Sequence, residues 1–162
     1  MRALTYLSTI IVSFLTLNSC LKDDCTLYKE YAQYEPVYIT QAEFDAPVEY
    51  KTVRPMESTG TIFAYGRYIF VNEFQKGIHI IDNQVPSNPK TLGFIEVTGN
   101  THFTIKNDIL YANKLEDLVA IDISDINHPK QVNRLPGVFQ LHRAQTSSQG
   151  ILAYYETTNE TL

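Results

Sequence analysis

Short apolar runs separated by turn residues recur along most of the chain. The runs lie at residues 61–65, 68–72, 78–82 and 91–97, and again at 103–105, 109–113, 118–122 and 131–135. They are rich in β-branched and aromatic residues, and Gly, Asn, Asp, Ser or Pro lie between them, as in short strands joined by turns. No stretch of 15 residues after Pro47 has helical periodicity. The pattern therefore predicts an all-β fold.

The eight runs form two units that align without a gap at a shift of 40 residues. The identical positions are Thr61 and Thr101, Phe63 and Phe103, Ile69 and Ile109, Ile81-Asp82 and Ile121-Asp122, and Pro89-Lys90 and Pro129-Lys130. Four strands in about 40 residues is the length of a β-propeller blade. Residues 150–155 match the start of the second unit's second strand. We predict a partial β-propeller with two four-stranded blades and the start of a third.

The alternation of residues within the runs gives a candidate core. We expect five aliphatic side chains to be buried, namely Ile69, Ile81, Ile109, Leu118 and Ile121. Asp82 and Asp122 end the third strand of each unit. Each carboxylate is placed to accept a backbone N–H bond in the following turn, as in an Asx turn, so we assign them a structural role.

The third strand of the second unit carries a family resemblance. Leu118-Val119-Ala120-Ile121-Asp122, with Ile123-Ser124-Asp125 and Pro129, resembles the LVIVD repeat of bacterial surface β-propeller proteins, and Ile78-His79-Ile80-Ile81-Asp82 with Asn88-Pro89 is a looser copy. Residues 34–38 and 76–83 are similar to a group of such lipoproteins of unassigned function. The resemblance covers residues 20–139 and implies a propeller fold with no catalytic residue. The repeat residues it marks are Ile78, Ile80, Ile81, Asp82, Leu118, Val119, Ile121 and Asp122.

The first 24 residues predict a lipid anchor. Arg2 precedes an uncharged segment, residues 3–21, that is too polar for a spanning helix but suits the signal peptide that we assign to residues 1–19. Leu17-Asn18-Ser19-Cys20 resembles a lipobox. Cleavage between Ser19 and Cys20 would leave an acylated Cys20 (diacylglycerol and palmitate) as the mature N-terminus, bound to the membrane. An ordinary cleaved signal or an uncleaved anchor are the alternatives.

Lys22-Asp23-Asp24 follows directly and is similar to the signal that sends some Gram-negative lipoproteins to the cell surface. A solvated linker is the alternative for this short motif. With the lipobox, it predicts a protein that is anchored in the bacterial outer membrane and displayed at the cell surface.

Residues 20–57 read as a linker and a tyrosine-rich lead-in segment. Residues 36–40 predict a short strand, and Thr40-Gln41-Ala42-Glu43 is a capping-box pattern that predicts a helix of one or two turns, ended by Pro47. We expect the tyrosines to pack against the following domain; a stacked saccharide platform is the less favoured alternative.

Composition and charge exclude several classes of function. The 13 basic and 18 acidic residues give a net charge of −5, which argues against nucleic-acid binding. Four histidines, His79, His102, His128 and His142, lack zinc-site spacing, and residues 122–127 lack the order of a calcium loop. We expect neither metal nor cofactor, and no nucleophile or phosphate-loop motif occurs.

The repeats at residues 58–162 are too few for a closed propeller, which has at least four blades. We therefore expect the strands around Thr61 and Tyr154 to lack partners and to allow self-association through open sheet edges. The resulting hypothesis is a lipid-anchored binding or interaction protein without catalysis, whose ligand is a protein or a glycan. The alternatives are a truncated fragment of a longer propeller lipoprotein, or part of a propeller enzyme acting on polysaccharides.

Overall fold

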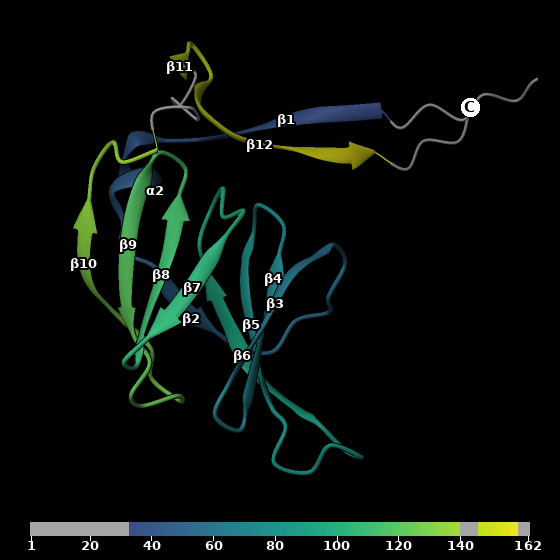
Figure 1. Ribbon diagram of the computed structural model, residues 1–162. Coiled ribbons are helices and arrows are strands. Elements are labelled where there is room, and N and C mark those ends of the chain that lie inside the picture. The colour runs from purple at the N-terminus through teal and green to yellow at the C-terminus, as the bar shows by residue number, and fades with distance from the viewer. Residues whose placement is uncertain (1–32, 140–145, 159–162) are drawn as a thin grey trace, which may run out of the picture. The chain divides into compact units, whose positions relative to one another are not determined.

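Strands dominate the part of the chain that the computed structural model describes, residues 33–139 and 146–158. They form three antiparallel sheets, accompanied by one short helix (Figure 1). All eight strands predicted for the two units are present, and their ends differ from the prediction by at most two residues. The all-β prediction is confirmed.

The first unit forms a sheet that we call the first repeat sheet. Its strand order is β2-β6-β5-β4-β3. The bounds are β2 Glu49–Lys51, β3 Thr59–Tyr65, β4 Tyr68–Glu73, β5 Gly77–Asp82 and β6 Lys90–Glu96. The sequence pattern did not predict β2, which pairs with β6 and places Tyr50 opposite Ile95. Tyr50 packs against the core, as expected of the lead-in tyrosines, whereas Tyr34 is 61% exposed and does not.

The second unit forms the second repeat sheet, with the strand order β10-β9-β8-β7. The bounds are β7 Phe103–Lys106, β8 Ile109–Lys114, β9 Asp117–Asp122 and β10 Lys130–Leu135. Its first turn consists of Asn107 and Asp108, both with positive φ (51° and 59°). These two residue types tolerate that conformation, which a tight hairpin requires.

Strand register corrects the gapless alignment of the two units. Tyr65 pairs with Tyr68 across the first turn, and Lys106 pairs with Ile109 across the second, so the first two strands are offset by 41. The loop from β4 to β5 has three residues between Glu73 and Gly77, whereas Lys114 and Asp117 enclose two. The offset therefore returns to 40 from β5 onward, and Ile69 is equivalent to Leu110, not to Ile109.

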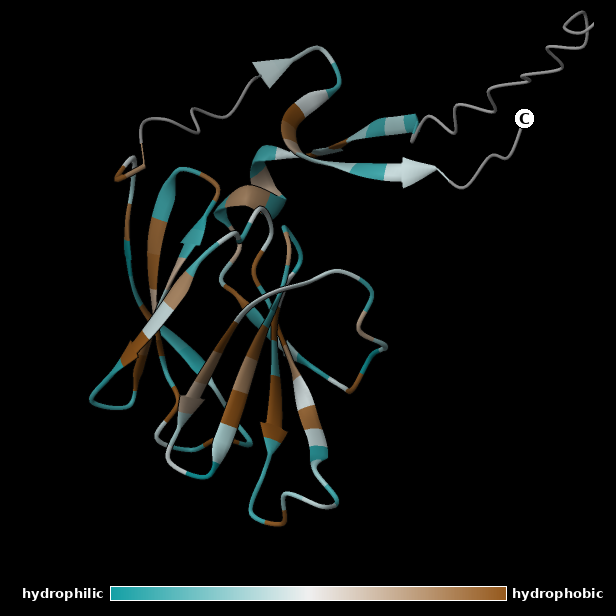
Figure 2. Ribbon diagram, turned by 45° about the vertical axis from the view of Figure 1, so that its right-hand side comes forward, coloured by the Kyte–Doolittle hydropathy of each residue, from teal (hydrophilic) through white to brown (hydrophobic). Residues whose placement is uncertain are grey.

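The main hydrophobic core lies between the two repeat sheets. The first sheet contributes one face, with Phe70, Ile78, Ile80 and Ile95, and the second contributes a face with Phe103, Leu110, Val119 and Ile121. Figure 2 shows these apolar stretches along the strands. Successive strand residues point to opposite faces, so only alternate residues can reach this core.

The predicted core was right only for Ile121, which is fully buried. Ile69, Ile81, Ile109 and Leu118 are half-buried, because they point to the faces that do not meet. Ile81 and Ile121 are equivalent in the repeat, yet they point away from and into the core, respectively. The two sheets thus pack with opposite faces of the same repeat against each other.

A third sheet joins the two ends of the described chain. It has the order β1-β12-β11, where β1 is Gln33–Ile39, β11 is Thr146–Ser147 and β12 is Gly150–Thr158. Residues 150–155 are a strand as predicted, but Tyr154 pairs with Val37 in β1. The expectation that the strand around Tyr154 lacks a partner is therefore wrong. Among the strands that the structure describes, β3 remains an edge strand, paired only with β4.

The helix α2 (Gln41–Asp45) begins at the predicted capping box. Thr40 Oγ1 accepts a hydrogen bond from Glu43 N at 3.2 Å, and the Glu43 carboxylate accepts one from Thr40 N at 2.7 Å. Lys114 and Arg134 of the second repeat sheet donate to carbonyl groups of Glu43 and Phe44, respectively. Cations at a helix C-terminus are favourable, so these contacts hold α2 on this sheet.

Candidate functional site

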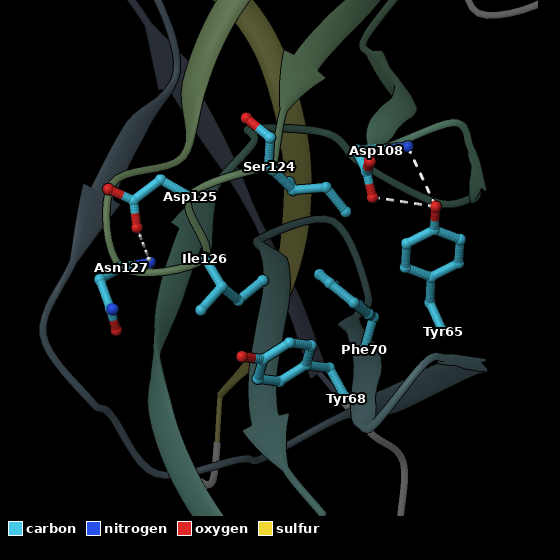
Figure 3. A pocket seen from close by; sticks show the side chains of 9 residues that line it. Tyr65, Tyr68, Phe70, Asp108, Ser124, Asp125, Ile126 and Asn127 are labelled. Carbon is cyan, nitrogen blue, oxygen red and sulfur yellow. Dashed lines mark hydrogen bonds between the residues drawn. The ribbon is translucent and has the colours of Figure 1, made fainter.

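A pocket of about 310 Å³ lies where the turns of the two repeat sheets meet. Three segments enclose it: the β3–β4 hairpin, the β7–β8 turn and the loop after β9. Figure 3 shows its lining side chains, which are Tyr65, Tyr68, Phe70, Asp108, Ile123, Ser124, Asp125, Ile126 and Asn127. Aromatic residues and two aspartates thus line one cavity.

One wall is fixed by a bond pair between the two sheets. Tyr65 Oη donates to Asp108 Oδ1 at 3.0 Å and accepts from Asp108 N at 3.1 Å. Tyr65 ends β3 and Asp108 belongs to the β7–β8 turn, so this contact joins the first turns of both repeats. The reciprocal bonds orient the Asp108 carboxylate beside the pocket (Figure 3).

The opposite wall is the loop that follows β9. Asp122 Oδ1 accepts from Ser124 N at 2.9 Å, as predicted for an Asx turn, and Asp125 Oδ1 accepts from Asn127 N at 3.1 Å. Hydrogen bonds from Ser124 hold the pKa of the Asp122 carboxyl below its ordinary value. The hydrogen bond with His128 does the same for the pKa of Asp125. The loop is therefore negatively charged at neutral pH.

The aromatic part of the pocket comes from the first repeat sheet. Tyr68 is half-buried, and the Arg67 guanidinium lies 4.9 Å from the centre of its ring. Phe70 lies deeper, fully buried in the core. An apolar ring surface beside oriented oxygen acceptors suits a ligand that has both C–H faces and hydroxyl donors.

A second polar cluster lies on the face of the first repeat sheet away from the core. Glu73 and His79 are fully buried, and His79 Nε2 lies 2.6 Å from Glu73 Oε2. Arg54 Nη2 is 3.4 Å from Glu73 Oε1, and its guanidinium lies 5.0 Å from the centre of the Phe94 ring. The other imidazole nitrogen has no partner in the described structure. The dyad is closed off from solvent, so a substrate does not reach it, and it is a buried hydrogen-bonded pair.

The structure places the repeat residues marked by the sequence in two equivalent strands. Ile78, Ile80, Ile81 and Asp82 lie in β5, and Leu118, Val119, Ile121 and Asp122 lie in β9. Asp82 Oδ1 accepts from Gln84 N at 2.9 Å, which matches the bond of Asp122. Arg67 also pairs with Asp82 at 3.1 Å. The predicted structural role of both aspartates is therefore borne out by their hydrogen bonds.

The predicted lipidation site, Cys20, lies outside the described residues, as do Ser19 and Lys22-Asp23-Asp24. Within residues 33–139 and 146–158, no helix is long and apolar enough to cross a membrane. The same residues contain no group of three or more His, Cys, Asp or Glu side chains positioned to hold a metal ion.

Sequence reasoning did not identify the pocket. The sequence pattern marks Tyr65, Tyr68 and Asp108 only as strand ends and turn residues. It marks Asp125 as part of the LVIVD-like segment and of an incomplete calcium pattern. Their proximity depends on how the two repeat sheets pack. The sequence signal for this site is the presence of aspartates in the turns, and aspartate is common in turns of any function.

Comparison of the chain with family models, with curated proteins and with solved structures finds no match.

Proposed function

We propose that this protein is a lipid-anchored, surface-displayed binding module of the LVIVD β-propeller type, without catalysis, and that it binds a saccharide between its repeat sheets. The pocket at Tyr68 and Asp125 is the observation that carries the binding proposal. The resemblance of β5 and β9 to the LVIVD repeat, together with the lipobox, supports the remaining parts.

Three features of the packing support propeller-type stacking. Each repeat runs through four antiparallel strands, and the chain passes from the fourth strand of one sheet to the first strand of the next. The first strands lie together, with Phe63 of β3 and Phe103 of β7 at a ring distance of 6.2 Å. The opposite faces of the repeat meet at the interface. Blades arranged around an axis share all three features, because every blade uses one face toward its predecessor and the other toward its successor.

The chemistry of the pocket supports a saccharide as its ligand. Sugar hydroxyls are donors, and two carboxylates of the pocket are acceptors in fixed positions, that of Asp108 held by the Tyr65 hydroxyl and that of Asp125 by the backbone N–H of Asn127. The C–H face of a pyranose is apolar and fits an aromatic ring such as that of Tyr68. A volume of about 310 Å³ suits one or two sugar units at most.

Binding is tested with the full chain in detergent on an oligosaccharide array, followed by titration of the best-retained oligosaccharide. Tyr68→Ala removes the ring, and Asp125→Asn removes the charge but keeps an acceptor for Asn127 N. We expect each to weaken binding by about tenfold or more, equivalent to one charge-assisted hydrogen bond or one stacked ring.

Matched controls for these variants are Tyr155→Ala and Asp45→Asn, since both residues are exposed and lie outside the pocket. They should bind like the parent chain. If no oligosaccharide is retained, or if pocket and control variants lose binding equally, the pocket is not a saccharide site.

The anchor is tested separately by mass spectrometry of membrane-extracted protein. We expect the mature chain to begin at Cys20 carrying acyl chains, and Cys20→Ala to leave the membrane fraction. An intact N-terminus at Met1, or unchanged membrane partition of Cys20→Ala, would contradict it. Surface display predicts that protease added to intact cells cleaves the parent chain but spares a variant in which Lys22-Asp23-Asp24 is replaced by Ala-Ala-Ala.

A further inference from the structure

Each repeat sheet has an apolar face inside the core and a second face outside it, which in the first sheet combines exposed apolar residues with the buried Glu73–His79 pair. In the core, the first sheet contributes Phe70, Ile78, Ile80 and Ile95, and the second contributes Phe103, Leu110, Val119 and Ile121. Because the two sheets have the same register apart from one loop residue, every core position has an equivalent on the outer face of the other sheet.

The outer face of the second sheet carries the equivalents of the first sheet's core residues. The four equivalents are Tyr111 for Phe70, Leu118 for Ile78, Ala120 for Ile80 and Leu135 for Ile95. The first three of these are half-buried, and Leu135 is 50% exposed. A hollow of about 340 Å³ lies on this face, between Thr104, Tyr111, Leu118 and Phe139. In the first repeat sheet, the same repeat positions are covered by another sheet. The outer face of the second repeat sheet is therefore similar to a surface that packs against a sheet.

The outer face of the first sheet carries the equivalents of the second sheet's core residues. Ile62 corresponds to Phe103, Ile69 to Leu110 and Ile81 to Ile121. Ile62 is 67% exposed, an unusual environment for a strand isoleucine. On the same face Val71 and His79, the equivalents of Ala112 and Val119, are already buried, and the segment around Arg54 lies over Phe94 and Glu73. The part that remains accessible is the row formed by Ile62, Ala64, Ile69 and Ile81.

We infer that a second copy of this chain packs the outer face of its first repeat sheet against the outer face of the second repeat sheet, repeating the interface inside the molecule. The internal contact supplies the argument for this occupant, because the accessible row on the first sheet and the outer face of the second sheet are the equivalents of residues that already pack together inside the molecule. Two different faces meet, so the contact is head-to-tail. Such a contact closes into a ring when its rotation allows it and extends into a filament otherwise.

The internal ring contacts predict which residues meet between copies. Phe103 lies 6.2 Å from Phe63 and 6.5 Å from Phe70, measured between ring centres. The equivalents of these three residues are Ile62, Thr104 and Tyr111. Ile62 of one copy should therefore lie against Thr104 and Tyr111 of another copy.

The inference is tested by the mass of the full chain in detergent, from light scattering with the detergent contribution subtracted. Ile62→Lys and Thr104→Glu each place a charge in the proposed contact, and both positions are exposed, so the fold accepts them. We expect each variant to raise the concentration for half-association by at least about tenfold. Val85→Lys, at a 55% exposed apolar position in the β5–β6 loop, should have no effect.

A mixture of the two variants distinguishes a head-to-tail contact from a symmetric one. Ile62→Lys keeps a native second sheet, and Thr104→Glu keeps a native first sheet, so the mixture should associate again. A disulfide gives the same information at residue level. In a Cys25→Ser background, Ile62→Cys mixed with Thr104→Cys should yield a covalent dimer, whereas each variant alone should yield far less.

Four outcomes would overturn the inference. A parent chain that remains monomeric up to about 100 times the concentration used for saccharide binding has no such interface. Association that persists in both charge variants, or no recovery in the mixture, would place the contact elsewhere. Association that is abolished only by proline at the edge strands, as in Lys106→Pro and Lys130→Pro, would assign it to sheet edges. None of these readouts depends on ligand binding, so the pocket and the interface fail separately.

Discussion

The two repeat sheets have the same strand pattern and opposite burial. In both, a two-residue turn joins the first two strands, and an aspartate closes an Asx turn after the third. Yet Phe70 is fully buried in the first sheet, whereas its equivalent in the second, Tyr111, is half-buried. The comparison teaches that a repeat position has no fixed environment, because two stacked sheets cover different faces of the repeat.

Polar residues at equivalent positions of the two sheets differ for the same reason, because the two sheets cover different faces of the repeat. His79, paired with buried Glu73, is equivalent to Val119, which packs in the apolar core. The position carries a polar residue on the face away from the core and an apolar residue inside it. Glu73 is equivalent to Lys114, whose burial lowers the pKa of the ammonium group and which donates to the carbonyls of α2. The two sheets therefore use the same position for contacts with different lead-in segments.

The largest expected effect comes from removing one ring at equivalent positions. Phe70→Ala leaves a cavity in the core and should reduce the free energy of unfolding by about 3–5 kcal/mol. Tyr111→Ala should cost about 1–2 kcal/mol, because part of its ring is already solvated. Urea unfolding, followed by circular dichroism at a concentration where the chain is monomeric, measures both. Equal losses would contradict the assignment of covered and uncovered faces.

The next largest effect is expected when His79 of the first sheet is replaced by valine, the residue at the equivalent position of the second sheet. His79→Val leaves Glu73 buried without its imidazole partner, so we expect a loss of about 3 kcal/mol in the free energy of unfolding. Adding Glu73→Leu removes the carboxylate that has lost its imidazole partner and should recover much of this loss. His102→Val, at an exposed position, is the control and should change little. Unchanged stability of His79→Val would show that the dyad does not form.

A smaller contrast is expected for the buried asparagines Asn113 and Asn72. Asn113 Oδ1 accepts from the amides of Thr101 and His102, both at 3.0 Å. Asn72 Oδ1 has no partner within the described structure, although its amide donates to Gly77 O at 3.1 Å. Asn113→Ala should therefore cost about 2 kcal/mol and Asn72→Ala about 1 kcal/mol. Thermal unfolding of the two variants side by side measures the difference, and the reverse order would contradict these bond assignments.

The smallest effect is the acid sensitivity of the loop after β9. The pKa values of Asp122 and Asp125 are lowered by hydrogen bonds that favour the charged forms. The native state therefore binds fewer protons, so their contribution is complete above the ordinary aspartate pKa, about 3.9, and disappears as pH falls through the lowered values. Asp122→Asn and Asp125→Asn should each flatten the decline in urea midpoint below about pH 4. An unchanged pH profile would show that these carboxylates titrate alike in both states.

Local interactions made much of the fold predictable from the sequence. Three kinds of element depend on residues close together in the chain. They are the strands of both units, the Asx turns at Asp82 and Asp122, and the capping box at Thr40. Such elements are recognisable because strand alternation, turn chemistry and helix capping act over a few residues. The offset of the alignment by one residue was not visible, because it depends on the length of one loop.

Only the tertiary structure decided which faces are buried, which strands are partners and where the pocket lies. Alternation groups Ile69 with Ile81 and Phe70 with Ile80 on two faces, and it does not say which of the faces meets another sheet. The pairing of β1 with β12 and the meeting of Tyr65 with Asp108 join segments far apart in the sequence. The two sheets come together because packing two apolar faces removes their surface from water. That gain depends on the partner surface, which no short stretch of sequence contains.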